Sequence, residues 1–288
     1  MKTVPFTKMH GLGNDFVIIN AFNSPVLLSE KEILYMSHRN CGIGFDQLLV
    51  VEPPSTAEAQ FKYRIFNADS SEVEQCGNGA RCFARYVFDQ GLTKDRSFPV
   101  ETARGIITPY LEENGLVTVD MGVPNFDPAS LPLNSTADSK GTYTLPLDAD
   151  LDMGSLLSFE AVSMGNPHAV ISVPSADLAP VEQLGSWLET HPAFPNRVNV
   201  EFVETVNQNT LKMRVFERGT GETLACGTGA CASAAVGLKS GRLQGTVSIH
   251  MRGGTLQVRW DGSGTPLFMT GPAVTVFHGE CLIPSLLD

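Results

Sequence analysis

A repeat between the two halves constrains the fold of this 288-residue chain more than any other feature. The segment CGNGA that begins at Cys76 recurs as CGTGA at Cys226, and the segments before them, 61–67 and 211–217, also align. A match of this length in two places indicates an ancient duplication. The sequence therefore predicts two similar domains that face each other, each with a cysteine at the equivalent position.

Polar side chains recur in the same order ahead of each cysteine. The first half has Asn14, Gln47 and Asn67, and the second half has Asn166, Asn199 and Glu217. The first two members of each set precede an apolar run, and the third ends one. The repeat therefore places an equivalent group of hydrogen-bonding side chains in each predicted domain.

Short segments rich in Val, Ile and Phe, bounded by Gly or Pro, predict β-strands in both halves. In the first half they lie near 15–20, 46–51, 61–66, 98–102, 105–111 and 116–120, and in the second near 159–164, 168–173, 198–204, 210–216, 246–251 and 254–260. Helices are fewer. A capping-box pattern from Ser29 to Glu32 predicts one that runs toward Asn40, and 180–190 is a second candidate.

The two most informative helices are predicted directly after the cysteines. Apolar residues recur at helical spacing from Ala80 to Phe88 and from Ala230 to Leu238, and a glycine follows each segment. The second segment is apolar all round, as a helix enclosed by a sheet would be. We therefore predict an α+β fold of two pseudo-symmetric domains, each a mixed β-sheet or barrel wrapped around a central helix with its cysteine at the N-terminus.

The position of Cys76 and Cys226 predicts chemistry. Unpaired N–H groups and the helix dipole at a helix N-terminus favour thiolate over thiol, and the neighbouring glycines let a carboxylate approach these N–H groups. Inversion of an sp³ carbon needs a base on one side and an acid on the other, which two opposed thiols provide. The other four cysteines lack this glycine setting and are expected to be structural: Cys41, Cys82, Cys231 and Cys281.

Composition and motifs exclude several classes of function. A formal net charge of −11 argues against nucleic acid and anionic membranes as partners, because both are bound through clustered Lys and Arg. No signal-peptide pattern or long apolar run occurs, so a cytoplasmic location is expected. The cysteine spacings do not fit a zinc site, and no phosphate-binding or dinucleotide motif is present, so we expect no metal and no cofactor.

The sequence closely resembles the diaminopimelate epimerases, which interconvert LL- and meso-diaminopimelate without pyridoxal phosphate in lysine and peptidoglycan-precursor biosynthesis. The resemblance runs from MHGLGNDF at 9–16 to VFHGE at 276–280, and includes NADS at 67–70, EQCGNGARC at 74–82 and MGNPH at 164–168. The stretch FERGTGETLACGTG at 216–229 is a further match. Together these motifs are highly specific.

The resemblance implies a role for each matching residue. Cys76 and Cys226 would be the acid/base pair, with Gly77, Asn78, Gly227 and Thr228 holding the reacting carboxylate at the helix N-termini. The other substrate-binding positions would be Asn14, Gln47, Asn67, Asn166, Asn199, Glu217 and Arg218. His168 and Glu217 match groups that lie near the cysteines and tune their ionisation. Arg218 suits a carboxylate and Glu217 an ammonium group, which fits a diamino dicarboxylate.

The resemblance also implies the assembly and the domain boundaries. It predicts a homodimer, although Phe277 stands where family members carry a tyrosine at the dimer interface. The family topology returns the last strand to the first domain. We therefore expect an N-terminal domain of residues 1–124 with 272–288, and a C-terminal domain of residues 125–271.

Other functions compete with this interpretation. A proline racemase or a phenazine-pathway isomerase would share the architecture, but proline would leave Arg218 and the distal amides without a partner, and both cysteines are present here. A thiol–disulfide redox protein would be expected to carry a Cys-x-x-Cys motif, which is absent. A non-catalytic amino-acid-binding protein could use the same helix N-termini.

Overall fold

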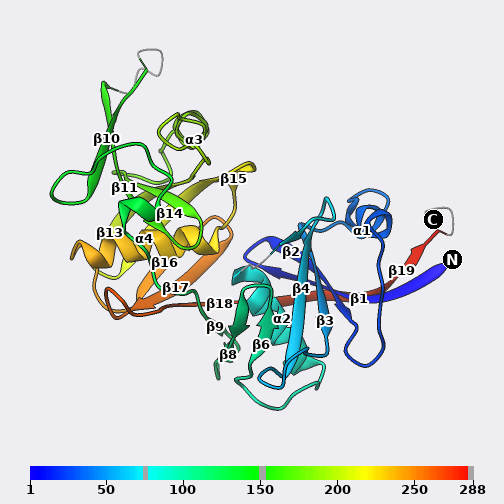
Figure 1. Cartoon of the computed structure of the whole chain (residues 1–288). Coiled ribbons are helices and arrows are strands. Elements are labelled where there is room, and N and C mark those ends of the chain that lie inside the picture. Colours follow the sequence, from blue (N-terminus) through cyan, green and yellow to red (C-terminus); the bar gives the residue numbers. More distant parts are fainter. Residues whose placement is uncertain (74–76, 149–153, 285–288) are drawn as a thin grey trace. The chain divides into compact units, whose positions relative to one another are not determined.

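The computed structural model describes residues 1–73, 77–148 and 154–284. The chain divides into two units, Met1–Asp120 with Thr270–Asp288, and Met121–Met269 (Figure 1). Both units are rich in sheet and contain few helices, so the predicted α+β class is confirmed. The unit boundaries fall at 120 and 269, where the sequence placed them at 124 and 271.

The first unit is built on one mixed sheet. Its strands are β1 (Lys2–Gly11), β2 (Asn14–Asn20), β3 (Gln47–Glu52), β4 (Phe61–Asn67), β5 (Glu72–Val73), β6 (Val100–Thr102), β7 (Gly105–Ile107) and β19 (Val274–Ile283), with β8 (Tyr110–Leu111) and β9 (Val117–Asp120) completing the unit. Its helices are α1 (Glu30–Ser37) and α2 (Gly77–Asp89). The predicted capping box is formed, since Ser29 Oγ accepts from Glu32 N–H and Glu32 accepts from Ser29 N–H.

The second unit repeats this plan. Its strands are β10 (Thr142–Pro146), β11 (Leu156–Ser163), β12 (Pro167–Ser172), β13 (Asn199–Asn207), β14 (Thr210–Glu217), β15 (Gly221–Thr223), β16 (Val247–Met251), β17 (Gly254–Trp260) and β18 (Leu267–Gly271). Its helices are a short 3₁₀ turn (Pro128–Ser130), α3 (Val181–Glu189) and α4 (Gly227–Lys239).

The duplication is visible in the strand order. The sheet of the first unit runs β19-β1-β2-β3-β4-β6-β7, and the second unit contains the matching order β10-β11-β12-β13-β14-β16-β17. In both, the third strand is parallel to the fourth and the fifth is parallel to the sixth. Strand β19 pairs with β1 across residues far apart in the sequence, and Figure 1 shows the red end of the chain beside the blue one. It holds the place that β10 has in the second unit.

The helix after each cysteine is the centre of its unit. Nearly every residue of α4 is buried, as the uniformly apolar sequence predicted, and α4 contacts β11, β12, β13 and β17. Helix α2 is buried along most of its length and contacts β1, β2 and β9. In the second unit α3 adds a further core layer, with Leu184 and Leu188 in one apolar cluster with Phe202 and Phe216. These contacts fix the helix N-termini relative to the strand ends.

Candidate functional site

In the second unit, the predicted site residues gather where neighbouring strands of the sheet begin or end, along one edge of the sheet. His168 on β12 and Asn199 on β13 are neighbours because the two strands are parallel and in register at these residues. Strand β14 runs antiparallel to β13, so Glu217 at its end reaches the same edge. Cys226, at the N-cap of α4, joins them through the contacts described below.

Cys226 is buried and held at the N-cap of α4. Its Sγ accepts the Gly229 N–H at 3.4 Å and lies 3.5 Å from Thr228 Oγ1. Thr228 Oγ1 in turn accepts the side-chain amide N–H of Asn166 at 3.5 Å. The structure therefore brings Cys226, Thr228 and Asn166 into one connected group, while Gly227 forms the first turn of the helix.

The ionisation of Cys226 is set by its surroundings more than by the helix. Burial raises the pKa of this thiol well above its ordinary value, and the negative charges of Glu217 and Glu201 raise it further. The Thr228 hydroxyl and the Gly229 N–H lower it, but to a smaller extent. The expectation that the helix terminus would favour thiolate therefore does not hold for Cys226 in this structure, because burial outweighs the helix N–H groups.

His168 lies between Asn166, which the sequence predicted as a site residue, and Glu201, which it did not. Both His168 and Glu201 are completely buried, and His168 Nδ1 lies 2.6 Å from Glu201 Oε1. His168 Nε2 lies 3.0 Å from Asn166 Oδ1. Sequence reasoning missed Glu201, although a single acid inside the apolar run VNVEFV was a detectable signal.

The remaining residues of this half have defined contacts. Asn199 donates to Pro167 O at 3.0 Å and accepts the Arg218 N–H at 3.0 Å, so its amide joins two chain segments. The Glu217 carboxylate accepts a hydrogen bond from Thr223. The Arg218 guanidinium is exposed and donates to Asn196 O at 3.3 Å.

In the first unit, the predicted amides form two pairs. Gln47 Nε2 donates to Asn67 Oδ1 at 3.0 Å, across the antiparallel strands β3 and β4. Asn78, in the first turn of α2 after Gly77, donates to Asn14 Oδ1 at 3.2 Å. Gln47 Oε1 is buried, with no hydrogen-bond partner among the residues described. Cys76 lies outside the described residues.

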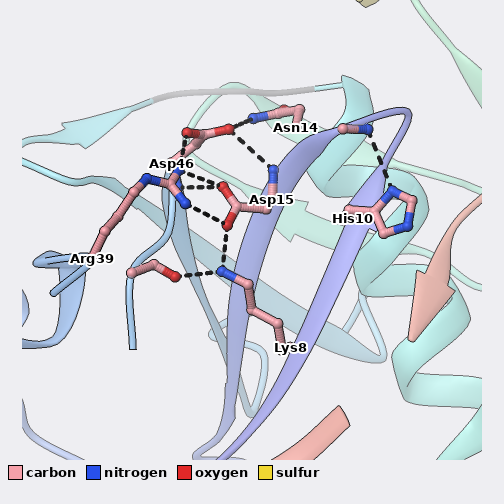
Figure 2. Close-up of polar contacts among 8 residues, drawn as sticks. Lys8, His10, Asn14, Asp15, Arg39 and Asp46 are labelled. Carbon is pink, nitrogen blue, oxygen red and sulfur yellow. Dashed lines mark hydrogen bonds and ion pairs between the residues drawn. The ribbon is translucent and has the colours of Figure 1, made fainter. Parts of the chain in front are cut away.

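An ion-pair cluster that the sequence did not reveal holds Asn14 (Figure 2). Asn14 Nδ2 donates to Asp46 Oδ2 at 3.0 Å, and the Asp15 N–H donates to the same oxygen at 3.1 Å. Arg39 donates to Asp15 Oδ1 at 2.9 Å and to Asp46 Oδ1 at 2.7 Å, while Lys8 pairs with Asp15. Asp46, directly before β3, therefore holds both the Asn14 side chain and the backbone N–H of the next residue.

We expect Asp15→Asn to destabilise the first unit by about 2 kcal/mol at pH 7, because it removes the partner of Lys8, which is buried. Burial alone would raise the pKa of Asp15, but hydrogen bonds from Arg39 and Lys8 and their positive charges lower it well below its usual value. The stabilisation is thus complete above about pH 4, the unfolded-state value, and is lost as the pH falls toward the folded-state pKa.

Urea unfolding at pH 7 and pH 2.5 checks this expectation. The difference between wild type and Asp15→Asn should be smaller at the lower pH. Asp261→Asn is the matched control, because its ion pair with Arg259 is exposed and should contribute less than about 1 kcal/mol. An equal difference at both pH values would show that the charge of Asp15 is not what stabilises the cluster.

Among the described residues, no group of three or more His, Cys, Asp or Glu side chains is arranged to hold a metal ion. Within the same ranges no helix is long and apolar enough to cross a membrane.

The family comparison and two similar relatives point to the same family. The chain matches the family described as diaminopimelate epimerase over residues 6–126 and 160–276. A diaminopimelate epimerase of Azoarcus sp. is 53% identical over 281 residues, which cover 98% of this chain and 99% of the relative. The diaminopimelate epimerase of Nitrosomonas europaea is 55% identical over 275 residues, covering 95% of this chain and 97% of the relative.

Solved structures with lower identity share the fold. A phenazine biosynthesis protein of the PhzF family from Bacillus anthracis has a TM-score of 0.70 at 21% identity, covering 98% of this chain and all of that one. A hydroxyproline epimerase from Agrobacterium vitis, with bound trans-4-hydroxy-L-proline, has a TM-score of 0.68 at 14% identity, covering 99% of this chain and 94% of that one. The fold of this chain is thus shared with a protein that binds trans-4-hydroxy-L-proline.

Proposed function

Because the chain belongs to the diaminopimelate epimerase family, we propose that it interconverts LL- and meso-diaminopimelate by proton transfer between Cys76, Cys226 and the α-carbon. This reaction supplies the meso isomer for lysine and peptidoglycan precursors. One thiolate removes the α-proton from one face, and the other thiol donates a proton to the opposite face. The reaction needs no cofactor, since the site itself stabilises the carbanion.

The observation that carries this proposal is the placement of Cys226. Its Sγ lies at the N-cap of a thirteen-residue helix, where the first-turn N–H groups can bind the reacting carboxylate. Negative charge moves from the α-carbon onto that carboxylate when the proton leaves, so the helix N-terminus stabilises the transition state more than the ground state. Gly227 and Thr228 provide this part of the site, and Gly77 and Asn78 take the same role at α2.

The raised pKa of Cys226 supports the acid role for this residue before substrate binds. Burial keeps the thiol protonated at neutral pH, and the Glu217 charge adds to this effect. Binding of a substrate ammonium at Glu217 would offset that charge and bring the pKa of Cys226 closer to the operating pH. Substrate binding would thereby prepare Cys226 for the base role in the reverse direction.

The other amides and charges match the far end of the substrate. A diamino dicarboxylate has a second carboxylate for Arg218, whose guanidinium is exposed. Its second ammonium group suits Gln47 Oε1, which is buried with no hydrogen-bond partner among the described residues. Proline lacks these groups, which favours diaminopimelate over the ligands of the more distant structural relatives.

Incubation with LL-diaminopimelate in D₂O tests the proposal. We expect the meso isomer to form with deuterium at the inverted α-carbon, while L-proline under the same conditions takes up none. A non-catalytic binding protein would retain diaminopimelate on equilibrium dialysis without exchange, and that outcome would overturn the proposal. The double variant Cys76→Ala, Cys226→Ala is the blank.

We also propose that the protein is a homodimer that works in the cytoplasm. Strand β19 is the outer strand of its sheet, and it exposes the apolar side chains Val274, Val276 and Phe277. An exposed apolar edge strand favours pairing with a second copy. The mechanism needs free thiols, which a reducing cytosol maintains. Sedimentation equilibrium should give twice the chain mass for wild type and a smaller mass for Phe277→Glu.

A further inference from the structure

Glu201 is a buried acid that the proposed reaction does not use. It is the third residue of β13, is completely buried, and has one partner for its carboxyl group among the described residues, His168 Nδ1 at 2.6 Å. Its second oxygen, Oε2, has no hydrogen-bond partner among the described residues. An acid in this position costs free energy unless a specific interaction compensates for its burial.

The geometry around His168 fixes where its protons lie. Nε2 faces the carbonyl oxygen of Asn166 at 3.0 Å, so Nε2 must carry a proton to form this hydrogen bond. Nδ1 faces Glu201 Oε1, so one further proton is shared between these two atoms. Whether that proton lies on the imidazole or on the carboxyl group, the pair has no net charge and Nε2–H donates to Asn166.

Removing the carboxyl group would release this arrangement. A histidine without the Nδ1 partner can place its single proton on either ring nitrogen. With the proton on Nδ1, the Nε2 lone pair would face Asn166 Oδ1, and the amide would have to turn over. The N–H group that Asn166 now directs at Thr228 Oγ1 would then point elsewhere.

Burial keeps the proton within the pair. Burial raises the pKa of the Glu201 carboxyl, the charge of His168 opposes this rise, and the charge of Glu217 adds to it. A carboxylate without a proton at this position would also raise the pKa of the Cys226 thiol. The shared proton therefore limits the negative charge beside the thiol.

We propose that Glu201 is a positioning residue for the Cys226 half of the site. It holds His168 in the state that donates from Nε2, and His168 in turn holds the Asn166 amide with its N–H group toward Thr228 and the substrate. Glu201 acts through these two side chains and needs no contact with the substrate. The proposal rests on the proposed function for the meaning of Asn166.

The packing of α4 supports the same conclusion independently. A Cβ atom at Gly229 would lie 2.8 Å from Glu201 Oε1 and 3.3 Å from Cys226 Cβ. The carboxyl group and the cysteine therefore touch the same point in the first turn of α4. The chain leaves this point free of a side chain, so Glu201 can lie against the helix that carries Cys226.

Nitrogen NMR of the histidine rings tests the arrangement without any activity. In ¹⁵N-histidine-labelled wild type at pH 7, the His168 signals, identified by their loss in His168→Asn, should show a proton on Nε2. Glu201→Gln should keep it, because the glutamine N–H₂ can donate to Nδ1. A wild-type ring with an unprotonated Nε2 would overturn the proposal, whether or not the protein epimerises diaminopimelate.

A double-mutant cycle then separates positioning from a general loss of structure. Glu201→Leu should lower kcat/KM for LL-diaminopimelate about 10- to 100-fold, whereas Glu201→Gln should stay within about threefold of wild type. In an Asn166→Ala background the same leucine substitution should change kcat/KM less than about threefold, because its route to the substrate is gone. Equal effects in both backgrounds would refute the proposal, while wild-type inactivity would refute only the proposed function.

Discussion

Replacing Cys226 by alanine should lower kcat/KM for both LL- and meso-diaminopimelate by about 10³-fold or more. General acid–base catalysis contributes 10²- to 10⁴-fold in rate, and this variant loses an acid in one direction and a base in the other. The thiol is buried at the N-cap of α4, so water has little access to replace it. The loss should appear in kcat more than in KM, because the carboxylate-binding N–H groups remain.

Isotope exchange makes this prediction sharper than a rate alone. With one thiol left, the α-proton on one face can still be removed and returned to the same face. Cys226→Ala should therefore exchange deuterium into one isomer without inversion, and Cys76→Ala should do so with the other isomer. This pattern would also show which cysteine serves which isomer.

Cys231→Ala is the matched control for this experiment. Cys231 is also buried on α4, but it lies beyond the first turn and away from the N-cap. We expect it to retain epimerisation within a few-fold of wild type. If Cys226→Ala retained inversion at the level of this control, the two-cysteine mechanism would be wrong.

The architecture could be predicted because the sequence repeat includes the motifs, the strands and the helices of both units. The cysteine motifs, the apolar runs before them and the helices after them occur in the same order in both halves, and the two sheets have matching strand orders. Strand β1 was missed because its burial is irregular and Pro5 interrupts its apolar residues. Pairing with β19, from the other end of the chain, forms this strand, and local sequence does not show such a pairing.

Only those site residues that occur at equivalent positions in both halves could be predicted from the repeat. The repeated amides lie at strand ends as expected, while Glu201 and Asp46 have no equivalent that would mark them. The direction of the pKa shift of Cys226 was also missed, because the helix N-terminus can be read from sequence whereas burial and nearby carboxylates depend on the packed structure.

Gly229→Ala should destabilise the second unit and lower its activity, although the substitution lies in a helix. Alanine is normally preferred to glycine in a helix by about 1 kcal/mol, so propensity alone predicts stabilisation. Here the new Cβ would lie 2.8 Å from Glu201 Oε1, and Glu201 cannot withdraw because it is buried and hydrogen-bonded to His168. Overpacking of this kind costs about 1–3 kcal/mol, so steric conflict should exceed the gain in propensity.

The effect on activity should be larger than the effect on stability. A shift of the first turn of α4 moves Cys226 and the carboxylate-binding N–H groups together, and a misplacement of about 1 Å can reduce the rate about 10²-fold. We therefore expect Gly229→Ala to fold, with a free energy of unfolding lower by up to about 2 kcal/mol and kcat/KM lower by about 10²-fold or more.

A second cycle identifies the cause of this loss. In a Glu201→Ala background the contacts of the new Cβ with Glu201 Oε1 at 2.8 Å and Glu201 Cγ at 3.3 Å are removed, and the contact with Cys226 Cβ at 3.3 Å remains. Gly229→Ala should then cost less than half of its effect on the free energy of unfolding in wild type, measured by urea denaturation. If Gly229→Ala lowered the free energy of unfolding equally in both backgrounds, the glycine would be required for a reason other than the packing of Glu201 against α4.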